Sequence, residues 1–205
     1  LALGGSYERA FQNYLIEGAK KKTGKPAPVV ALDERWSGVI DTLLPEAPEV
    51  ASKRKAKIKR ATELITEAQK PDLDHGRQLA KGLCLSCHSI QGEGAGFAPP
   101  LDGSSQRDIH ALVTAIFDPN QAAENIFRAY RIEKKSGEVI EGFLGARTAT
   151  QLTVMIMGGA EIEVPVSEIK KAGYVNGKSA MLDIFQDALS DEHVIDLVRY
   201  LRTVK

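Results

Sequence analysis

Apolar residues recur at helical spacing along most of the chain, and they alternate with polar residues in one stretch of its second half. A spacing of three to four residues indicates an amphipathic helix, whereas strict alternation indicates a strand. The segments with helical spacing are 7–15, 33–44, 48–70, a short segment that begins at residue 74, 106–117 and 191–203. This pattern predicts a mainly α-helical protein.

The alternating stretch contains four short segments, which are 128–135, 139–147, 151–158 and 160–166. Turn-forming residues separate them: Ser136-Gly137, Thr148-Ala149-Thr150 and Gly158-Gly159. Short alternating runs joined by such turns are typical of hairpins in an antiparallel sheet. We therefore expect a small antiparallel β-sheet, inserted at about residues 126–170 into an otherwise helical region.

The character of the chain changes at Pro71, which suggests a domain boundary. Residues 1–70 are predicted to form a helical N-terminal region, either a hairpin or the tail of a helical-repeat domain. A basic run at 53–60 lies within it, and we interpret this run as a solvated helix face. Residues 71–205 form the second predicted domain, which contains the β insertion.

Charge and hydropathy exclude several classes of partner. The formal net charge is zero; residues 1–70 hold 13 Lys and Arg against 9 Asp and Glu, and residues 71–205 hold 14 against 18. Such a small asymmetry argues against nucleic acid as the main partner. No run of about 18 apolar residues occurs, so no membrane span is expected. The start at Leu1, without Met, suggests a mature or excised segment.

The candidate chemistry lies in the sequence Cys84-Leu85-Ser86-Cys87-His88, which contains both cysteines of the chain. C-x-x-C-H is the attachment sequence of c-type haem, in which both thiols form thioethers and the histidine binds iron. The alternatives are a redox dithiol, half of a zinc site, or a disulfide. A thioredoxin-like context is missing, and no second cysteine pair exists to complete a zinc site. The motif therefore predicts one covalent haem c.

The surroundings of this motif resemble class I cytochrome c, and more narrowly the planctomycete-type putative haem-binding domain of bacteria. The shared features are Gly76 in the first helix, the C-x-x-C-H motif, the loop Ala98-Pro99-Pro100-Leu101, a Ser-x-Met loop at Met181, and a last helix ending at Tyr200-Leu201. The chain departs from the family pattern in Ala98, where the family has Gly, and in Leu182, where it has Pro. The resemblance covers about residues 72–205.

The resemblance implies the ligands of the haem iron and their support. His88 and Met181 would be the axial ligands, and the carbonyl of Pro99 would accept a hydrogen bond from His88. Tyr200 would pack against Gly76 and close the haem pocket. The alternative sixth ligands are His75, His110 and His193. Met155 and Met157 lie in an apolar, strand-like run, where methionine is expected in the core.

A haem with both axial positions filled has no open site for a substrate, so we expect a non-catalytic electron-transfer domain. Its partner would be a redox protein or a fused dehydrogenase domain, within a larger oxidoreductase system. Thioether attachment generally takes place outside the cytoplasm, which predicts a periplasmic or otherwise extracytoplasmic location. Two alternatives remain: a haem protein with a labile or open sixth site, such as a peroxidase or gas sensor, and a docking domain in which redox chemistry is secondary.

Overall fold

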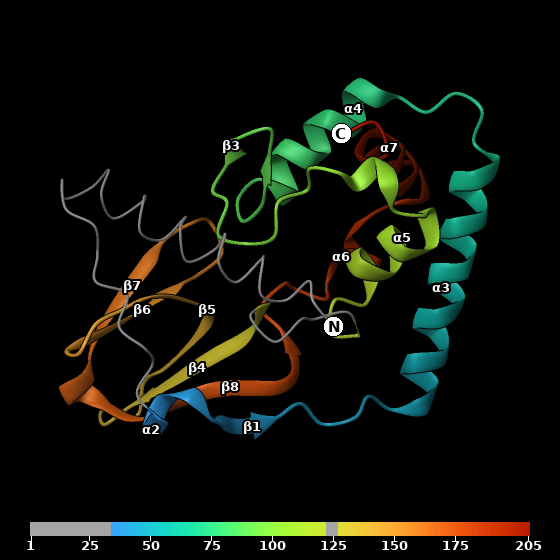
Figure 1. Cartoon of the computed structure of the whole chain (residues 1–205). Coiled ribbons are helices and arrows are strands. Elements are labelled where there is room, and N and C mark those ends of the chain that lie inside the picture. Colours follow the sequence, from blue (N-terminus) through green and yellow to red (C-terminus); the bar gives the residue numbers. More distant parts are fainter. Residues whose placement is uncertain (1–33, 122–126) are drawn as a thin grey trace. The chain divides into compact units, whose positions relative to one another are not determined.

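The computed structural model describes residues 34–121 and 127–205, which divide into two compact units (Figure 1). The sheet unit combines the described residues up to Leu43 with residues 127–180. The helical unit combines residues 44–121 with residues 181–205. Each unit is thus assembled from segments that are far apart in the sequence, and neither follows the expected boundary at residue 70. The helix expected at 7–15 lies outside the described residues.

The sheet unit is built on six strands, preceded by the short helix α2 (Glu34–Ser37). The strands are β1 (Val39–Thr42), β4 (Arg128–Lys134), β5 (Val139–Arg147), β6 (Gln151–Met155), β7 (Glu161–Pro165) and β8 (Ile169–Ser179). Their order in the sheet is β1-β8-β4-β5-β6-β7. Neighbouring strands are antiparallel except β1, which runs parallel to β8.

The four strands predicted from the alternating pattern are confirmed as β4 to β7, whose bounds match the predicted segments closely. In β4, Tyr130 and Ile132 are fully buried, whereas Arg131 between them pairs with Glu141 across the sheet at 2.9 Å. The turn between β4 and β5 contains Gly137 at φ 93°, a conformation that favours glycine. Local alternation and turn chemistry are therefore enough to specify these four strands.

The core of the sheet unit is built from residues of the strands together with Trp36 of α2. Its buried members are Trp36, Tyr130, Ile132, Ile140, Leu144, Leu152, Val154, Val164, Ile169 and Ala172. The hydroxyl of Tyr130 donates a hydrogen bond to the carbonyl oxygen of Trp36 at 2.8 Å, so the one polar atom of this ring is satisfied inside the core. Residues near position 36 thus belong to the sheet unit.

Two strands of the sheet unit, β1 and β8, were not predicted. The helix expected at 33–44 is wrong beyond Ser37, because residues 39–42 form β1. The loop expected at Met181 begins only after Ser179, because residues 169–179 form the 11-residue strand β8. Of the described residues, 40% lie in helices and 27% in strands, so "mainly α" is corrected to a mixed α and β protein. Both strands pair with partners distant in sequence, which override weak local β-propensity.

The helical unit contains five α-helices among its described residues. They are α3 (Pro48–Glu67), α4 (Leu73–Leu79), α5 (Ile109–Phe117), α6 (Phe185–Ala188) and α7 (Asp191–Leu201). Between α4 and α5 lie four shorter elements: the π-helical turn η1 (Ala80–Cys84), the strands β2 (Ser89–Ile90) and β3 (Glu93–Gly94), and a 3₁₀ turn (Ser104–Gln106). No helix in the described part of the chain combines the length and apolarity that crossing a membrane requires.

Side-chain caps fix the starts of three of these helices. The amides of His75, Ala111 and His193 donate to Asp72, Asp108 and Ser190, at 2.9, 2.7 and 3.2 Å. Each cap satisfies an amide that has no partner within its helix. The cap of α4 is therefore Asp72, and the helix begins at Leu73, one residue before the predicted start at residue 74.

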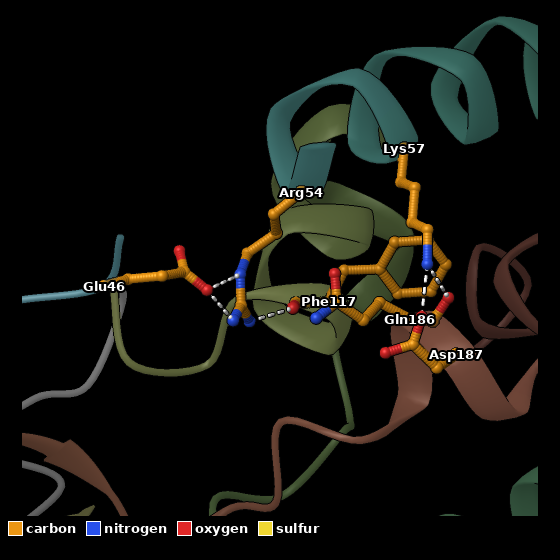
Figure 2. Close-up of polar contacts among 6 residues, drawn as sticks. All are labelled: Glu46, Arg54, Lys57, Phe117, Gln186 and Asp187. Carbon is orange, nitrogen blue, oxygen red and sulfur yellow. Dashed lines mark hydrogen bonds and ion pairs between the residues drawn. The ribbon is translucent and has the colours of Figure 1, made fainter. Parts of the chain in front are cut away.

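Helix α3 packs into the core of the helical unit. Its buried residues Ile58, Ala61 and Ile65 contact residues of α5 and α7 in one apolar cluster. Its basic residues also reach these elements: Arg54 bonds Glu46 and the carbonyl oxygen of Phe117, and Lys57 pairs with Asp187 (Figure 2). The interpretation of 53–60 as a purely solvated face is wrong for Arg54, which is 8% exposed.

Candidate functional site

The helix that leads to the two cysteines widens just before it reaches them. Helix α4 has the ordinary hydrogen-bond spacing, but the amide of Leu85 donates to the carbonyl of Ala80, five residues earlier, at 3.1 Å. Ala80 faces the core and is 1% exposed, while Lys81, Gly82 and Leu83 are exposed. This wide turn delivers Cys84 to the start of the C-x-x-C-H motif.

The motif itself forms a tight turn around one carbonyl group. The amides of Cys87 and His88 both donate to the carbonyl oxygen of Cys84, at 3.1 and 2.8 Å. Both cysteines are half-buried free thiols. Burial, with a smaller contribution from Cys87, raises the pKa of the Cys84 thiol to about 11, so this thiol is protonated at neutral pH.

His88 is held by the loop that follows it. Its Nδ1 atom lies 2.6 Å from the carbonyl oxygen of Pro99, so the expected contact is present. Burial lowers the pKa of His88, and the bond to Pro99 opposes this shift in part. A neutral imidazole that donates from Nδ1 leaves the Nε2 lone pair available for a metal.

The loop from residue 89 to residue 101 wraps the motif through backbone hydrogen bonds. The amides of Ala95, Ala98 and Leu101 donate to the carbonyls of Leu85, Cys87 and Ser89, at 2.9, 2.9 and 2.8 Å. Within this loop β2 and β3 form a short hairpin, which was not predicted; its turn, Gln91-Gly92, has φ values of 51° and 82°. Positive φ values favour glycine, so Gly92 in the turn was a hairpin signal that was present in the sequence.

Gly94 makes the closest backbone approach in this loop, which leads to a prediction. A Cβ atom at position 94 would lie 2.3 Å from the carbonyl oxygen of His88, and the residue has φ 109°. Gly94→Ala should therefore displace the loop and destabilise the protein by about 2 kcal/mol or more. Denaturant titration followed by circular dichroism measures the loss, and an unchanged midpoint would contradict the close approach.

The helices α4 and α7 cross at Gly76. A Cβ atom there would lie 2.2 Å from the carbonyl oxygen of Asp196 and 2.8 Å from Cβ of Tyr200, so the predicted approach of Tyr200 to Gly76 is present. Sequence reasoning missed Asp196, which is 4% exposed. Its carboxylate accepts from the amide of Asp72 and lies 2.8 Å from Nδ1 of His75. The signal available in the sequence was the position of this charged residue, Asp196, on the apolar face of the last helix.

Met181 lies two residues beyond the end of β8, in the segment that connects β8 to α6, and it is half-buried. Of the other methionines, Met155 is buried in the sheet unit as expected, but Met157 is 68% exposed and is not a core residue.

The alternative histidine ligands have other surroundings. His75 faces Asp196 and contacts the ring of His193, with ring centroids 5.4 Å apart. His110 is exposed on α5. The Asp196 carboxylate holds Nδ1 of His75 as the Pro99 carbonyl holds Nδ1 of His88, so His75 stays an alternative sixth ligand.

The donor set of the motif fits covalent haem better than it fits a bare metal ion. A structural zinc site needs four ligands, and the motif supplies only Cys84, Cys87 and His88. Within the described ranges, no group of three or more His, Cys, Asp or Glu side chains could hold a metal ion. Two free thiols beside an oriented imidazole are what a haem with two thioethers and one proximal histidine needs.

Comparison with known families agrees with this geometry. Residues 73–139 match the family model described as Cytochrome c. The matched segment includes α4, the C-x-x-C-H turn, the Pro99 loop and α5, and it ends at the start of β5. No curated protein matches the chain. The family match supports a cytochrome c domain in this segment, and with it a covalently bound haem c and haem-based electron transfer.

Proposed function

We propose that this protein carries one haem c, attached through Cys84 and Cys87, with His88 as the proximal ligand of the iron. The observation that carries this proposal is the contact between Nδ1 of His88 and the carbonyl of Pro99 at 2.6 Å. It selects the tautomer whose Nε2 atom can bind the iron, and it also orients the ring. Cys84 and Cys87 precede His88 on the same tight turn.

Met181 is the proposed ligand on the opposite face of the haem. It belongs to the helical unit together with His88, and it lies in a short segment without helix or strand, where a side chain can be presented to a cofactor. Met155 belongs to the sheet unit, and Met157 lies in an exposed turn of the same unit. Among the three methionines, Met181 is therefore the best placed.

The function that follows is one-electron transfer without substrate chemistry. When bound, the haem supplies the redox couple, and methionine ligation raises its potential. The residues of the chain orient the proximal imidazole, bury the motif and keep the thiols in place. We further propose an extracytoplasmic location and a redox protein or fused dehydrogenase domain as the partner, within a larger oxidoreductase system. Tyr200, which packs on Gly76, helps to close the haem pocket.

Replacement of Met181 tests this ligation. The haem-loaded protein should show a low-spin ferric spectrum with a sulfur-to-iron charge-transfer band, and Met181→Ala should abolish this band and lower the reduction potential. Absorption spectroscopy and potentiometric titration measure both effects. Met157→Ala is the matched control, because its side chain is 68% exposed, and it should leave the spectrum unchanged.

Two results would overturn parts of this proposal. A high-spin ferric spectrum, or rapid binding of carbon monoxide to the reduced wild-type protein, would indicate an open or labile sixth site, as in a peroxidase or a gas sensor. A charge-transfer band that survives in Met181→Ala would show that another residue binds the iron.

A further inference from the structure

We propose that the π-helical turn Ala80–Cys84 is a positioning device, whose one extra residue sets the orientation in which Cys84 meets the haem. This inference rests on the proposed haem attachment and concerns the segment between two parts of the chain that are fixed independently. The upstream part is α4, and the downstream part is the turn that contains Cys87 and His88.

The upstream part is fixed by the contact of α4 with α7. The backbone at Gly76 approaches Asp196 so closely that even a Cβ atom would lie 2.2 Å from the carbonyl oxygen of that residue. The carboxylate of Asp196 also accepts the amide hydrogen of Asp72 at 2.8 Å. Helix α4 can therefore neither rotate nor slide on α7 without breaking these contacts.

The downstream part is fixed by the loop around the motif. The imidazole of His88 bonds to Pro99, and the carbonyls of Leu85 and Cys87 accept from Ala95 and Ala98, at 2.9 Å each. Cys84 joins the two parts: its carbonyl oxygen accepts from the amides of Cys87 and His88, while the wide turn sets where its backbone enters the motif. A change in the length of that turn would therefore alter the position and orientation of the Cys84 side chain.

The wide turn supplies one residue between these two fixed parts. In an α-helix each residue advances by about 1.5 Å and about 100°, and a hydrogen bond across five residues instead of four accommodates one residue more per turn. Without that residue, Cys84 would shift by about one such step relative to α4. A displacement of about 1 Å already costs on the order of a hundredfold in a reaction that depends on alignment.

Alignment matters because the proposed attachment is an addition reaction. Each cysteine S–H adds across one vinyl double bond of the haem, so that sulfur bonds to one carbon and hydrogen to the other, without an oxidant or reductant. Cys87 would remain beside its vinyl group when the turn is shortened, whereas Cys84 would not. The proposal therefore predicts an asymmetric defect.

The extra residue is needed for its length and not for its side chain. Gly82 is exposed in the middle of the turn, and a Cβ atom there would have no neighbour within 4 Å. Gly82→Ala preserves the number of residues and is therefore the matched control for a deletion of Gly82. A deletion of the exposed Lys81 shortens the turn by the same amount and should behave like the deletion of Gly82.

The experiment produces the full chain in a bacterium that attaches haem to C-x-x-C-H sequences. Mass spectrometry of the intact chain and of its peptides counts haem groups and thioethers, and the haemochrome spectrum reports unreacted vinyl groups. Wild type and Gly82→Ala should carry one haem through two thioethers. Either deletion should carry haem through Cys87 alone, with Cys84 free to react with iodoacetamide and at least a tenfold lower yield of the doubly attached form.

Three other outcomes would overturn the inference. Two thioethers in a deletion variant would show that the extra residue is not needed. Loss of both thioethers would show that the turn supports the whole motif instead of placing Cys84, and loss of haem in Gly82→Ala would show that the side chain at this position matters. A wild-type chain without covalent haem would instead refute the proposed function itself.

Discussion

Replacing Gly76 with alanine should destabilise the helical unit by about 2 kcal/mol, in spite of the higher helix propensity of alanine. The added Cβ atom would lie 2.2 Å from the carbonyl oxygen of Asp196 and 2.8 Å from Cβ of Tyr200, so α4 and α7 must move apart. Overpacking of a tight core costs about 1–3 kcal/mol or more, and the gain in helix propensity is about 1 kcal/mol. Since the obstruction is backbone, relaxation of a side chain cannot relieve it.

Denaturant titration of the haem-loaded protein measures this effect, and the yield of covalent haem is a second readout. Gly82→Ala, whose added Cβ atom meets nothing within 4 Å, should leave the midpoint unchanged or raise it slightly. If Gly76→Ala unfolds at the same denaturant concentration as wild type, the helices do not cross at this residue.

Replacing Arg54 with alanine should cost about 3 kcal/mol of folding free energy. Arg54 is 8% exposed; its Nη1 atom donates to the carbonyl of Phe117 at 2.9 Å, and its Nε atom donates to Glu46 at 3.2 Å (Figure 2). Removing the guanidinium leaves the buried carbonyl of Phe117 without this donor, which costs about 1–3 kcal/mol, and the lost packing of the buried side chain adds to this cost. The ion pair itself adds little, because the side chain of Glu46 is 31% exposed and can regain water.

Lys57→Ala provides the control on the same helix. Its ammonium group pairs with Asp187, and the two side chains are 45% and 69% exposed. Exposed ion pairs contribute about 0–1 kcal/mol, so this variant should unfold close to wild type. Equal losses in Arg54→Ala and Lys57→Ala, measured by denaturant titration, would contradict a special role for the buried guanidinium.

The same contacts change the role of the first 70 residues. The sequence suggested a separate helical region, whereas α3 contributes Ile58, Ala61 and Ile65 to one cluster with residues of α5 and α7. Removal of α3 would expose that apolar surface to water and leave the carbonyl of Phe117 without Arg54. A helix that reads as basic and poor in apolar residues thus has a buried stripe too narrow to be recognised from its sequence.

The candidate site was predictable from the sequence where its chemistry is local. Cys84, Cys87 and His88 are contiguous, so their spacing alone indicates the attachment motif. The contact of Pro99 with His88 came from a family resemblance, since no local rule connects a histidine to a carbonyl 11 residues later. The wide turn before Cys84 could not be predicted, because the residues Ala80–Cys84 are compatible with an ordinary helix.

The sequence by itself determined the elements whose partners are close in the chain: the attachment turn, the hairpins of β4 to β7, and the amphipathic helices α5 and α7. Only the tertiary structure decided that residues 39–42 form a strand beside β8 and that Arg54 is buried. It also decided that the carboxylate of Asp196 accepts a hydrogen bond from the amide of Asp72. The physical reason is that periodicity and turn chemistry act over a few residues. In contrast, the partner that satisfies a buried charge or a strand edge lies about 60 to 140 residues away in this chain, where no local pattern indicates it.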